Sequence, residues 1–383
     1  MQDFQTFIER KPLYYKEINH KRVHHAYSLL KPHIKHPRTV HIVGTNGKGS
    51  TGRILAHLAY HSGLCIGHFS SPHIVKFNER IWIDGCDSSD EVLEHAHQRL
   101  FPILGQEMSE SLSYFEYTTL LALVVFEECD LMILEAGLGG EFDASNVCDK
   151  ELSIITPIGL DHQAFLGETI EEIAGTKIRS IQNKVLLALQ PYSEVFEVAK
   201  EIALKKEAEL FIYEKADNMS EQLLTIIKEK SWADYLADNA GVALKALDIL
   251  GIKYEINDLL TVELFGRFYA LTKNIRIDVG HNPLAAVAIE KVLDERVILI
   301  YNSLDDKDYE EVLRILQPKV KHVEIIDIHS QRVTTQKEIK QALNKLGIPY
   351  SDYEGSIQKN EKYLVFGSFY VVEEFLKRFN VSK

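Results

Sequence analysis

The sequence predicts an α/β protein of two domains, each built on a mainly parallel sheet that is covered by helices. The chain of 383 residues is long enough for two hydrophobic cores, since domains usually contain roughly 100–200 residues. Short apolar strands alternate with helical segments, which favours parallel crossover connections. The alternation restarts near residue 274. We therefore expect a first domain over residues 1–264 and a smaller, Rossmann-like domain over residues 265–383.

In the first domain, a β-branched strand at 40–43 runs into a glycine-rich turn, and helical spacing follows over 50–60. Ligands of such sheets bind at the carboxyl ends of the parallel strands, so residues that follow strands are the candidates for a site. Further strands are expected at 131–134, 153–156, 184–189 and 209–213, with helices at 117–128, 195–206 and 233–250.

The second domain repeats this rhythm after a stretch at 263–268, where Gly266 supplies the backbone freedom of a hinge. Ligands held on the two domains would be brought together by closure about this hinge. Strands are expected at 275–278, 297–300, 323–326 and 363–366, and helices at 283–293, 309–316, 336–346 and 370–379.

Composition narrows the class of protein. The net charge of −13 and the absence of a basic block argue against a nucleic-acid partner. The N-terminus lacks a signal-peptide pattern, and the apolar run at 120–126 is far below the ~18 residues of a membrane span. The four cysteines have no C-x-x-C spacing and are expected to be reduced packing residues. We expect a cytoplasmic protein without a membrane partner.

The turn after the first strand has the composition of a phosphate-binding loop. Its glycines let successive N–H groups face one anion, the following helix adds its positive end, and Lys48 can bridge the outer phosphates of a nucleotide, which we expect to be ATP. The match to the general P-loop pattern is imperfect, because Ile42 replaces its first glycine and Gly49 separates Lys48 from Ser50. A structural glycine-rich turn is the alternative. The candidate nucleotide residues are Gly44, Thr45, Asn46, Gly47, Lys48, Gly49 and Ser50.

Polar side chains also follow three later strands. Glu135 ends an apolar strand before three glycines, where a carboxylate is suited to Mg²⁺, although it could simply mark the strand end. His162 follows the next strand as a metal ligand or a solvated loop residue. Asp278 and His281 precede a helix that begins at Pro283, an arrangement that suits an amino acid or a phosphate, while helix capping explains the proline but neither Asp278 nor His281.

Several motifs occur together in the order of one family. They are Gly44–Ser50, Ser70–Ile74 with Phe77–Ile81, Phe115–Tyr117, Glu135–Gly140 with Asp143–Asn146, Asp161–Gly167, Gly266–Phe268, Asp278 with His281–Pro283, Asp306–Asp308, and Gly367–Ser368. Together they are far more specific than the phosphate turn alone. The chain resembles folylpolyglutamate synthase/dihydrofolate synthase of the Mur ligase superfamily, whose first domain is P-loop NTPase-like.

The resemblance implies an ATP-dependent ligase. ATP phosphorylates the carboxylate of dihydropteroate or a reduced folate, and the amino group of L-glutamate attacks the acyl phosphate, giving dihydrofolate or folylpolyglutamates. The implied metal ligands for Mg²⁺ are Ser71, Glu135 and His162, and further nucleotide contacts are Asn239 to adenine and Arg267 to phosphate. The implied substrate residues are Ser70, Pro72, His73, Phe77, Arg80 and Phe115 for the pterin-bearing substrate, and Asp278, His281 and Ser368 for glutamate. The implied catalytic residues are Lys48, Lys177 and His281.

Three positions depart from the family pattern. The usual Glu-Lys-Ala-Gly run reads Thr176–Arg179 and keeps only Lys177, which is similar to the lysine that is carbamylated in this family. Tyr235-Leu236 replaces a His-Gln pair before Asn239, and Phe265 replaces the proline before Gly266. These changes affect the expected carbamate, the adenine contacts and the hinge rigidity.

Two other functions remain open from the sequence. A peptidoglycan-precursor amino-acid ligase of the Mur type would share the chemistry, but the segments at 70–80 and 115–116 favour the folate branch. A P-loop nucleotide switch without ligase activity would not need Asp278 and His281. We expect a monomeric enzyme whose partners are small-molecule substrates.

Overall fold

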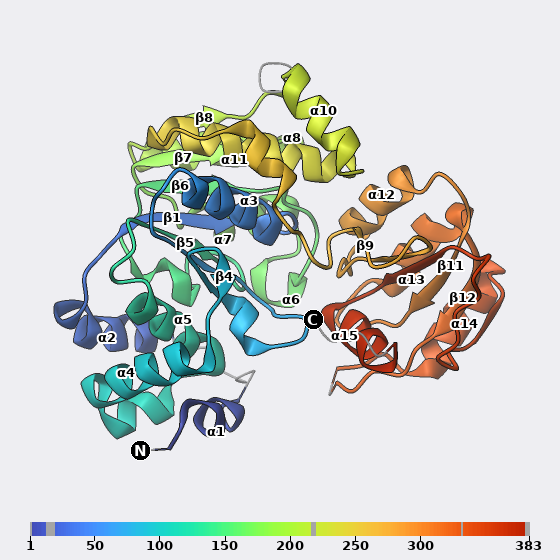
Figure 1. The fold of residues 1–383 in the computed structure, drawn as a ribbon, viewed down its shortest axis with the longest axis horizontal. Coiled ribbons are helices and arrows are strands. Elements are labelled where there is room, and N and C mark those ends of the chain that lie inside the picture. Colours follow the sequence, from blue (N-terminus) through green and yellow to red (C-terminus); the bar gives the residue numbers. More distant parts are fainter. Residues whose placement is uncertain (1, 13–19, 216–219, 331, 380–383) are drawn as a thin grey trace. The chain divides into compact units, whose positions relative to one another are not determined.

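The computed structural model describes residues 2–12, 20–215, 220–330 and 332–379, which form two compact units (Figure 1). The first unit falls within Met1–Ile158, Glu168–Ile226 and Asp238–Val262, and the second within Gly159–Gly167, Ile227–Ala237 and Glu263–Lys383. Two short segments that precede residue 264 thus pack with the second unit. The assignment of nucleotide and glutamate to separate domains stays a prediction.

The first unit contains an eight-stranded sheet of order β4-β3-β2-β5-β1-β6-β7-β8. All pairs from β2 to β8 are parallel, whereas β3 and β4 continue the sheet as antiparallel strands beside β2. The four strands expected after the first one are present, but β2, β3 and β4 were not anticipated. The bounds are β1 (Arg38–Val43), β2 (Ile66–Phe69), β3 (Ile81–Ile83), β4 (Cys86–Asp87), β5 (Leu131–Glu135), β6 (Leu152–Ile155), β7 (Lys184–Leu187) and β8 (Glu209–Ile212).

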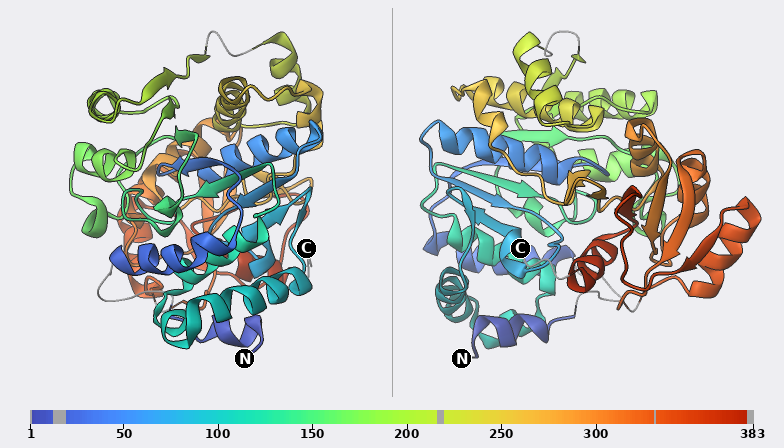
Figure 2. Two further views of the ribbon diagram at one scale, coloured as in Figure 1. Left: turned by 90° about the vertical axis from the view of Figure 1, so that its left-hand side faces the viewer. Right: turned by 45° about the vertical axis from the view of Figure 1, so that its right-hand side comes forward.

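Helices cover this sheet in layers. Helix α3 packs on β1, β2 and β5, while α5 contacts β2 and carries α4, with α1 and α2 outside it (Figures 1 and 2). Helix α5 begins three residues before its expected start, because Ser113 and Glu116 form a capping box there. The bounds are α1 (Phe4–Glu9), α2 (His20–Leu30), α3 (Lys48–His61), α4 (Asp90–Ser111), α5 (Tyr114–Val125), α7 (Ile170–Ile178), α8 (Ser193–Lys205), α10 (Glu221–Glu229) and α11 (Asp234–Leu250).

The second unit contains a six-stranded sheet of order β13-β12-β11-β14-β10-β9, in which only the β9 pairing is antiparallel. All four strands and four helices expected after residue 274 are present. The bounds are β9 (Tyr269–Ala270), β10 (Ile275–Ile277), β11 (Val297–Tyr301), β12 (Val320–Ile325), β13 (Tyr350–Asp352), β14 (Tyr363–Phe366), α6 (Gln163–Leu166), α12 (Pro283–Val292), α13 (Tyr309–Leu316), α14 (Gln336–Leu346) and α15 (Phe369–Arg378).

The cores explain the stability of both sheets. Strands β1, β5 and β6 are buried along nearly their whole length, as expected for parallel strands that helices cover on both faces. The core of the second unit includes Ala233, from the segment before α11, and Phe268. No helix in the described parts of the chain combines the length and apolar character that crossing a membrane requires.

Candidate active site

The phosphate loop joins β1 to α3 at the carboxyl edge of the first sheet. Gly44 has φ of +151°, and a Cβ there would lie 2.0 Å from Thr156 Oγ1, so this position admits only glycine. Gly47 has φ of +86° and caps α3. The N–H groups of Thr45 and Asn46 donate to the carbonyl of Pro157 at 2.9 and 3.1 Å. The N–H groups available to an anion are therefore those at the start of α3.

Lys48, the first residue of α3, and Glu135, the last residue of β5, approach each other at the phosphate loop. Glu135 ends β5 beside Ile42 of β1, and its side chain is only 6% exposed. Lys48 Nζ lies 4.0 Å from Glu135 Oε1 and donates to the carbonyls of Gly44 and Thr45 at 3.2 and 3.3 Å. The N–H of Ser71 donates to Glu135 Oε2 at 3.3 Å. A cation and a hard carboxylate thus meet at the phosphate loop.

Lys177 lies in the last turn of α7 and reaches the same loop. Its side chain is buried, and its amine donates to the carbonyl of Gly44 at 3.0 Å. Gly140 makes the approach of α7 possible, since a Cβ there would lie 2.4 Å from the Lys177 carbonyl oxygen. The structure therefore places Lys177 beside the phosphate loop, as its expected role requires. Its carbamylation stays a prediction.

Asn239, on α11, also contacts the loop. Its side-chain amide donates to Ser50 Oγ at 2.8 Å, and both residues are buried. A Cβ on Gly47 would lie 2.8 Å from Asn239 Oδ1, so the close approach depends on that glycine. The expected contact of Asn239 with adenine stays a prediction.

The segment between β2 and β3 is a structured loop. The Glu79 carboxylate accepts the N–H groups of Ile74, Val75 and Lys76, each at 2.9 Å. Arg80 is buried, and its Nε donates to His73 Nδ1 at 2.8 Å. Burial, together with this guanidinium, lowers the pKa of His73 to about 4. These contacts fix the loop that carries the expected pterin-site residues.

The aromatic members of that site lie on or beside α5. The Phe115 ring lies 5.7 Å from that of Phe69 and covers Gly137, where a Cβ would approach it to 2.7 Å. Phe77 makes an edge contact with Phe4 at 5.0 Å, so its ring is engaged in packing. The guanidinium of Arg80 lies 5.2 Å above the Tyr114 ring, a contact that the sequence analysis did not anticipate. Ser70 and Ser71 are half-buried in this loop, and Pro72 is exposed.

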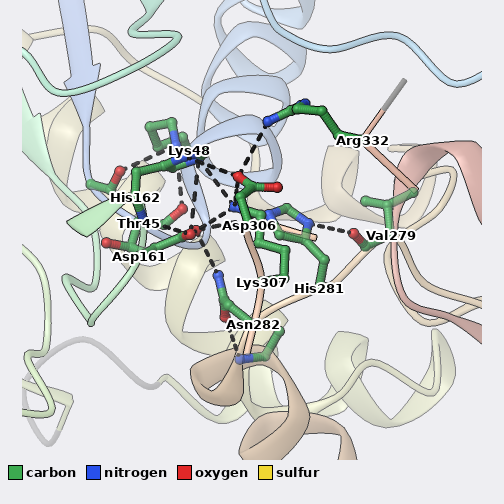
Figure 3. Close-up of polar contacts among 12 residues, drawn as sticks. Thr45, Lys48, Asp161, His162, Val279, His281, Asn282, Asp306, Lys307 and Arg332 are labelled. Atoms are coloured by element: carbon green, nitrogen blue, oxygen red, sulfur yellow. Dashed lines mark hydrogen bonds and ion pairs between the residues drawn. The ribbon is translucent and has the colours of Figure 1, made fainter. Parts of the chain in front are cut away.

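In the second unit, a polar cluster gathers around Asp161 (Figure 3). Lys307 Nζ lies 2.7 Å from Asp161 Oδ1 and donates to His162 Nε2 at 3.2 Å. His281 Nε2 lies 3.8 Å from Asp161 Oδ2, and the side-chain amide of Asn282 donates to that oxygen at 3.3 Å. The cluster brings together the two motifs that contain His162 and His281, which are more than a hundred residues apart.

The charges of this cluster determine its protonation. Burial alone would raise the pKa of Asp161, but His281, Lys307 and His162, which are all protonated in the acid range where this carboxyl titrates, hold it well below its usual range. Burial lowers the pKa of His162 to about 4. Burial and the Lys307 ammonium also lower the pKa of His281. Both rings are therefore neutral and Asp161 is charged near pH 7.

Asp278 is buried, and both of its carboxylate oxygens accept hydrogen bonds from protein donors. Its Oδ2 accepts the Tyr235 hydroxyl and the Phe268 N–H, each at 2.8 Å, and its Oδ1 accepts the Gly280 N–H at 2.7 Å. Burial raises the pKa of Asp278, which the Arg267 charge partly offsets. Direct contact of this carboxylate with glutamate stays a prediction.

Two other expected residues have local partners. The guanidinium of Arg267 lies 5.3 Å above the Phe369 ring and donates to the carbonyl of Gly266 at 3.2 Å. Ser368 caps α15, where its hydroxyl accepts the Val371 N–H at 3.2 Å. Both lie in the second unit, as do Asp278 and His281.

Sequence reasoning did not assign roles to Asp161, Lys307 or Tyr235. Asp161 and Lys307 stood inside recognised motifs, so their position was noted without a function. Tyr235 was noted only as a departure from the family pattern. Its place between two aspartates could have identified Lys307 as a candidate site residue, because a lysine between carboxylates is a candidate for a buried ion pair.

Comparisons with known proteins give a consistent result. No protein-family model matches the chain. Dihydrofolate synthase/folylpolyglutamate synthase of Haemophilus influenzae is 31% identical over 409 residues, which cover 93% of this chain and 91% of that protein. The protein of the same name from Buchnera aphidicola subsp. Schizaphis graminum is 32% identical and covers 87% of this chain and 86% of that protein.

Solved structures agree with these relatives. The crystal structure of Helicobacter pylori folylpolyglutamate synthetase matches with a TM-score of 0.79 and 38% identity, covering 98% of this chain and 97% of that one. Escherichia coli FolC in complex with DHPP and ADP matches with a TM-score of 0.82 and 26% identity, covering 98% and 96%. A bifunctional folylpolyglutamate synthase/dihydrofolate synthase with Mn, AMPPNP and L-glutamate bound matches with a TM-score of 0.82 and 25% identity, covering 99% and 97%.

These matches confirm the predicted fold class of two α/β domains, and they extend over nearly the whole chain. The chain belongs to the dihydrofolate synthase/folylpolyglutamate synthase family.

Proposed function

We propose that this protein is an ATP-dependent ligase that joins L-glutamate to dihydropteroate, to a reduced folate or to both. The family membership supports the reaction class, and relatives have been solved with ADP, with DHPP and with L-glutamate. The observation that carries the proposal is the meeting of Lys48 and Glu135 at the phosphate loop, with 4.0 Å between Nζ and Oε1. A partner-binding switch has no need of the second cluster around Asp161 and His281.

The first step is the transfer of a phosphoryl group. A carboxylate oxygen of the folate substrate attacks the γ-phosphorus of ATP, the bond to the β,γ-bridging oxygen breaks, and ADP leaves. The N–H groups at the start of α3 and the Lys48 ammonium stabilise the negative charge on the phosphate oxygens. Lys48 is already held toward the loop by the carbonyls of Gly44 and Thr45, so little reorganisation is needed.

The residues at the loop also fit a magnesium ion. Within the described chain, no cluster of three or more His, Cys, Asp or Glu side chains forms a metal cage. Mg²⁺ usually keeps several waters and binds one or two carboxylates together with substrate phosphates, so the single buried carboxylate of Glu135 suits it. Glu135 and Ser71, both in the first unit, would hold the ion, and the role of His162, in the second unit, as a further ligand stays a prediction. When bound, Mg²⁺ neutralises phosphate charge and orients the transferring group.

The second step forms the amide. The glutamate ammonium first loses one proton to solvent, the neutral nitrogen attacks the acyl carbon, inorganic phosphate leaves, and the nitrogen gives up a second proton. We propose His281 as the group that takes a proton. Its Nδ1 lies 3.0 Å from the carbonyl of Val279, so Nδ1–H donates there and Nε2 carries the lone pair. The lowered pKa of His281 keeps the ring neutral near pH 7, as a base requires.

The folate substrate is proposed to bind at the loop of residues 70–80 and at Phe115. The Arg80 side chain is held between His73 and Tyr114, and the Phe115 ring can stack on a pterin. The fixed loop supports recognition of a rigid aromatic ligand, because little ordering is left to occur on binding.

The test measures ADP release by the purified chain with ATP, Mg²⁺, L-glutamate and either dihydropteroate or tetrahydrofolate. We expect release that depends on both glutamate and a folate acceptor, and none with a UDP-linked muropeptide. Turnover with the muropeptide would overturn the folate assignment, and ADP release that ignores glutamate would overturn ligation.

We further propose that the enzyme works as a monomer in the cytoplasm. ATP and glutamate are abundant metabolites inside cells, which supports the cytoplasmic location. Light scattering and cell fractionation test the two statements separately.

A further inference from the structure

Helix α11 carries two polar side chains one turn apart, and each binds a different part of the molecule. Asn239 donates to Ser50 Oγ of the phosphate loop at 2.8 Å, within the first unit. Tyr235 donates its hydroxyl to Asp278 Oδ2 at 2.8 Å, within the second unit. The division between the two units falls between these residues, at Ala237 and Asp238. One continuous helix therefore belongs to both units.

The end of α11 that carries Tyr235 is held by contacts with the second unit. The Tyr235 ring packs against the hydrophobic core of the second unit, next to Ala233, which is itself a core residue. Its hydroxyl meets a carboxylate that is almost fully buried. A hydrogen bond to a charged acceptor is stronger than a neutral one, and a buried carboxylate that loses a donor is destabilised. The contact is therefore more than incidental packing.

Asp278 connects the Tyr235 contact to the proposed glutamate site. Its other two hydrogen bonds come from the N–H groups of Phe268 and Gly280, at 2.8 and 2.7 Å. Gly280 is the residue before His281. The Asp278 carboxylate thus fixes the turn that carries His281. The orientation of this carboxylate depends on the Tyr235 hydroxyl.

We infer that Tyr235 is a positioning residue that couples nucleotide binding to glutamate binding through α11. The helix backbone is rigid over the single turn from Tyr235 to Asn239, so a change at the phosphate loop is transmitted to the Asp278 turn. The inference rests on the proposed function, because it takes the His281 turn as part of the glutamate site.

The test uses Tyr235→Phe, which removes one oxygen atom and keeps the ring in the core. Tyr353→Phe is the matched control, because this second-unit tyrosine is also buried but its hydroxyl has no hydrogen-bond partner. Calorimetry with the full chain gives the Kd of AMPPNP, with and without L-glutamate, at saturating dihydropteroate. The ratio of the two Kd values is the coupling factor. Steady-state assays give the KM of glutamate and of ATP, and thermal melting checks the fold.

For the wild type we expect glutamate to tighten AMPPNP binding. In Tyr235→Phe the Kd of AMPPNP without glutamate should be unchanged, the coupling factor should fall close to 1, and the KM of glutamate should rise about tenfold. Tyr353→Phe should match the wild type. A lowered melting temperature with a normal coupling factor and a normal glutamate KM would reduce Tyr235 to a structural role and overturn the inference.

A second variant keeps the test decisive if Tyr235→Phe does not fold. Asp278→Asn retains the size of the side chain but replaces one acceptor oxygen by an amide nitrogen that cannot accept, so at least one of the three hydrogen bonds is lost, and it should also lower the coupling factor. An unchanged coupling factor in that variant, or additive effects of the two substitutions in the double variant, would overturn the inference. Failure of the wild type to release ADP in response to glutamate would instead overturn the proposed function, while the coupling factor can still be measured by binding.

Discussion

Replacement of Lys48 by alanine should abolish catalysis while leaving the first unit folded. Two unit charges 4.0 Å apart, the separation of Lys48 Nζ and Glu135 Oε1, attract by about 4 kcal/mol at an effective dielectric constant of about 20. Water that enters the vacated space reduces the loss of folding free energy to about 1–2 kcal/mol. Loss of a preorganised cation from phosphoryl transfer typically costs about a thousandfold or more in rate, or about 4 kcal/mol.

The activity loss should therefore far exceed the loss of stability. ADP release measures the first quantity and urea unfolding the second. Lys35→Ala is the matched control, because Lys35 pairs with Glu128 at 2.6 Å on the surface of the same unit, with both side chains about two-thirds exposed. Its turnover should stay within about twofold of the wild type. A folded Lys48→Ala enzyme with near wild-type turnover would refute the role of this loop in phosphate binding.

Three further predictions follow from the site and its titration. Glu135→Gln should lose Mg²⁺-dependent turnover and Mn²⁺ binding measured by electron paramagnetic resonance with AMPPNP; retention of both makes Glu135 structural. His281→Ala should raise the KM of glutamate much more than that of ATP, and equal rises would contradict its assignment. Burial lowers the pKa of His57 from 6.5 to about 4. As the pH falls below 6.5, the unfolded chain is protonated before the folded one. The free energy of unfolding should therefore be largest above pH 6.5 and should decrease towards pH 4. In urea titrations, His57→Gln should flatten this decrease, whereas the exposed control His95→Gln should not.

The parallel strands could be predicted because each is a short apolar run whose burial leaves a clear sequence signal. Strand β1 is buried in five of its six positions, and the glycine-rich turn follows it directly. Strands β3 and β4 were missed because they contain only three and two residues, and both residues of β4, the edge strand, are exposed. Helix α4 was missed because Pro102 and Gly105 interrupt its pattern, and Gly105 has a non-helical φ of +74°.

The sequence predicted only those site residues that belong to a local motif with a recognisable chemical role. Gly44–Ser50 and Glu135 follow neighbouring strands, so their proximity follows from the parallel topology. The ion pair of Lys307 with Asp161 joins residues 146 positions apart, and no local pattern indicates that pairing. The same holds for Arg22, which donates to Glu116 at 2.6 Å from a helix outside the sheet. Such partners are determined by tertiary packing.

Lys177 gives the sharpest remaining test of the metal site. In this structure its amine donates to the carbonyl of Gly44 at 3.0 Å and is buried. A carbamate would keep one N–H on Nζ but add two anionic oxygens near the Gly44 carbonyl, which would repel them, so we expect carbamylation to move the side chain away from Gly44. We expect that change when the metal ion that binds with the nucleotide supplies compensating positive charge.

The enzyme loaded with AMPPNP and Mg²⁺ under ¹³C-labelled CO₂ should therefore show a carbamate carbon signal that is absent from Lys177→Ala. That variant should be largely inactive, and short carboxylic acids should partly restore its turnover by replacing the lost oxygen ligands. Glu135→Gln is the control, since the acids should not rescue a variant whose Lys177 is intact. A bare amine still bonded to Gly44 in the loaded enzyme would exclude the carbamate and leave Lys177 as a clamp that fixes the phosphate loop.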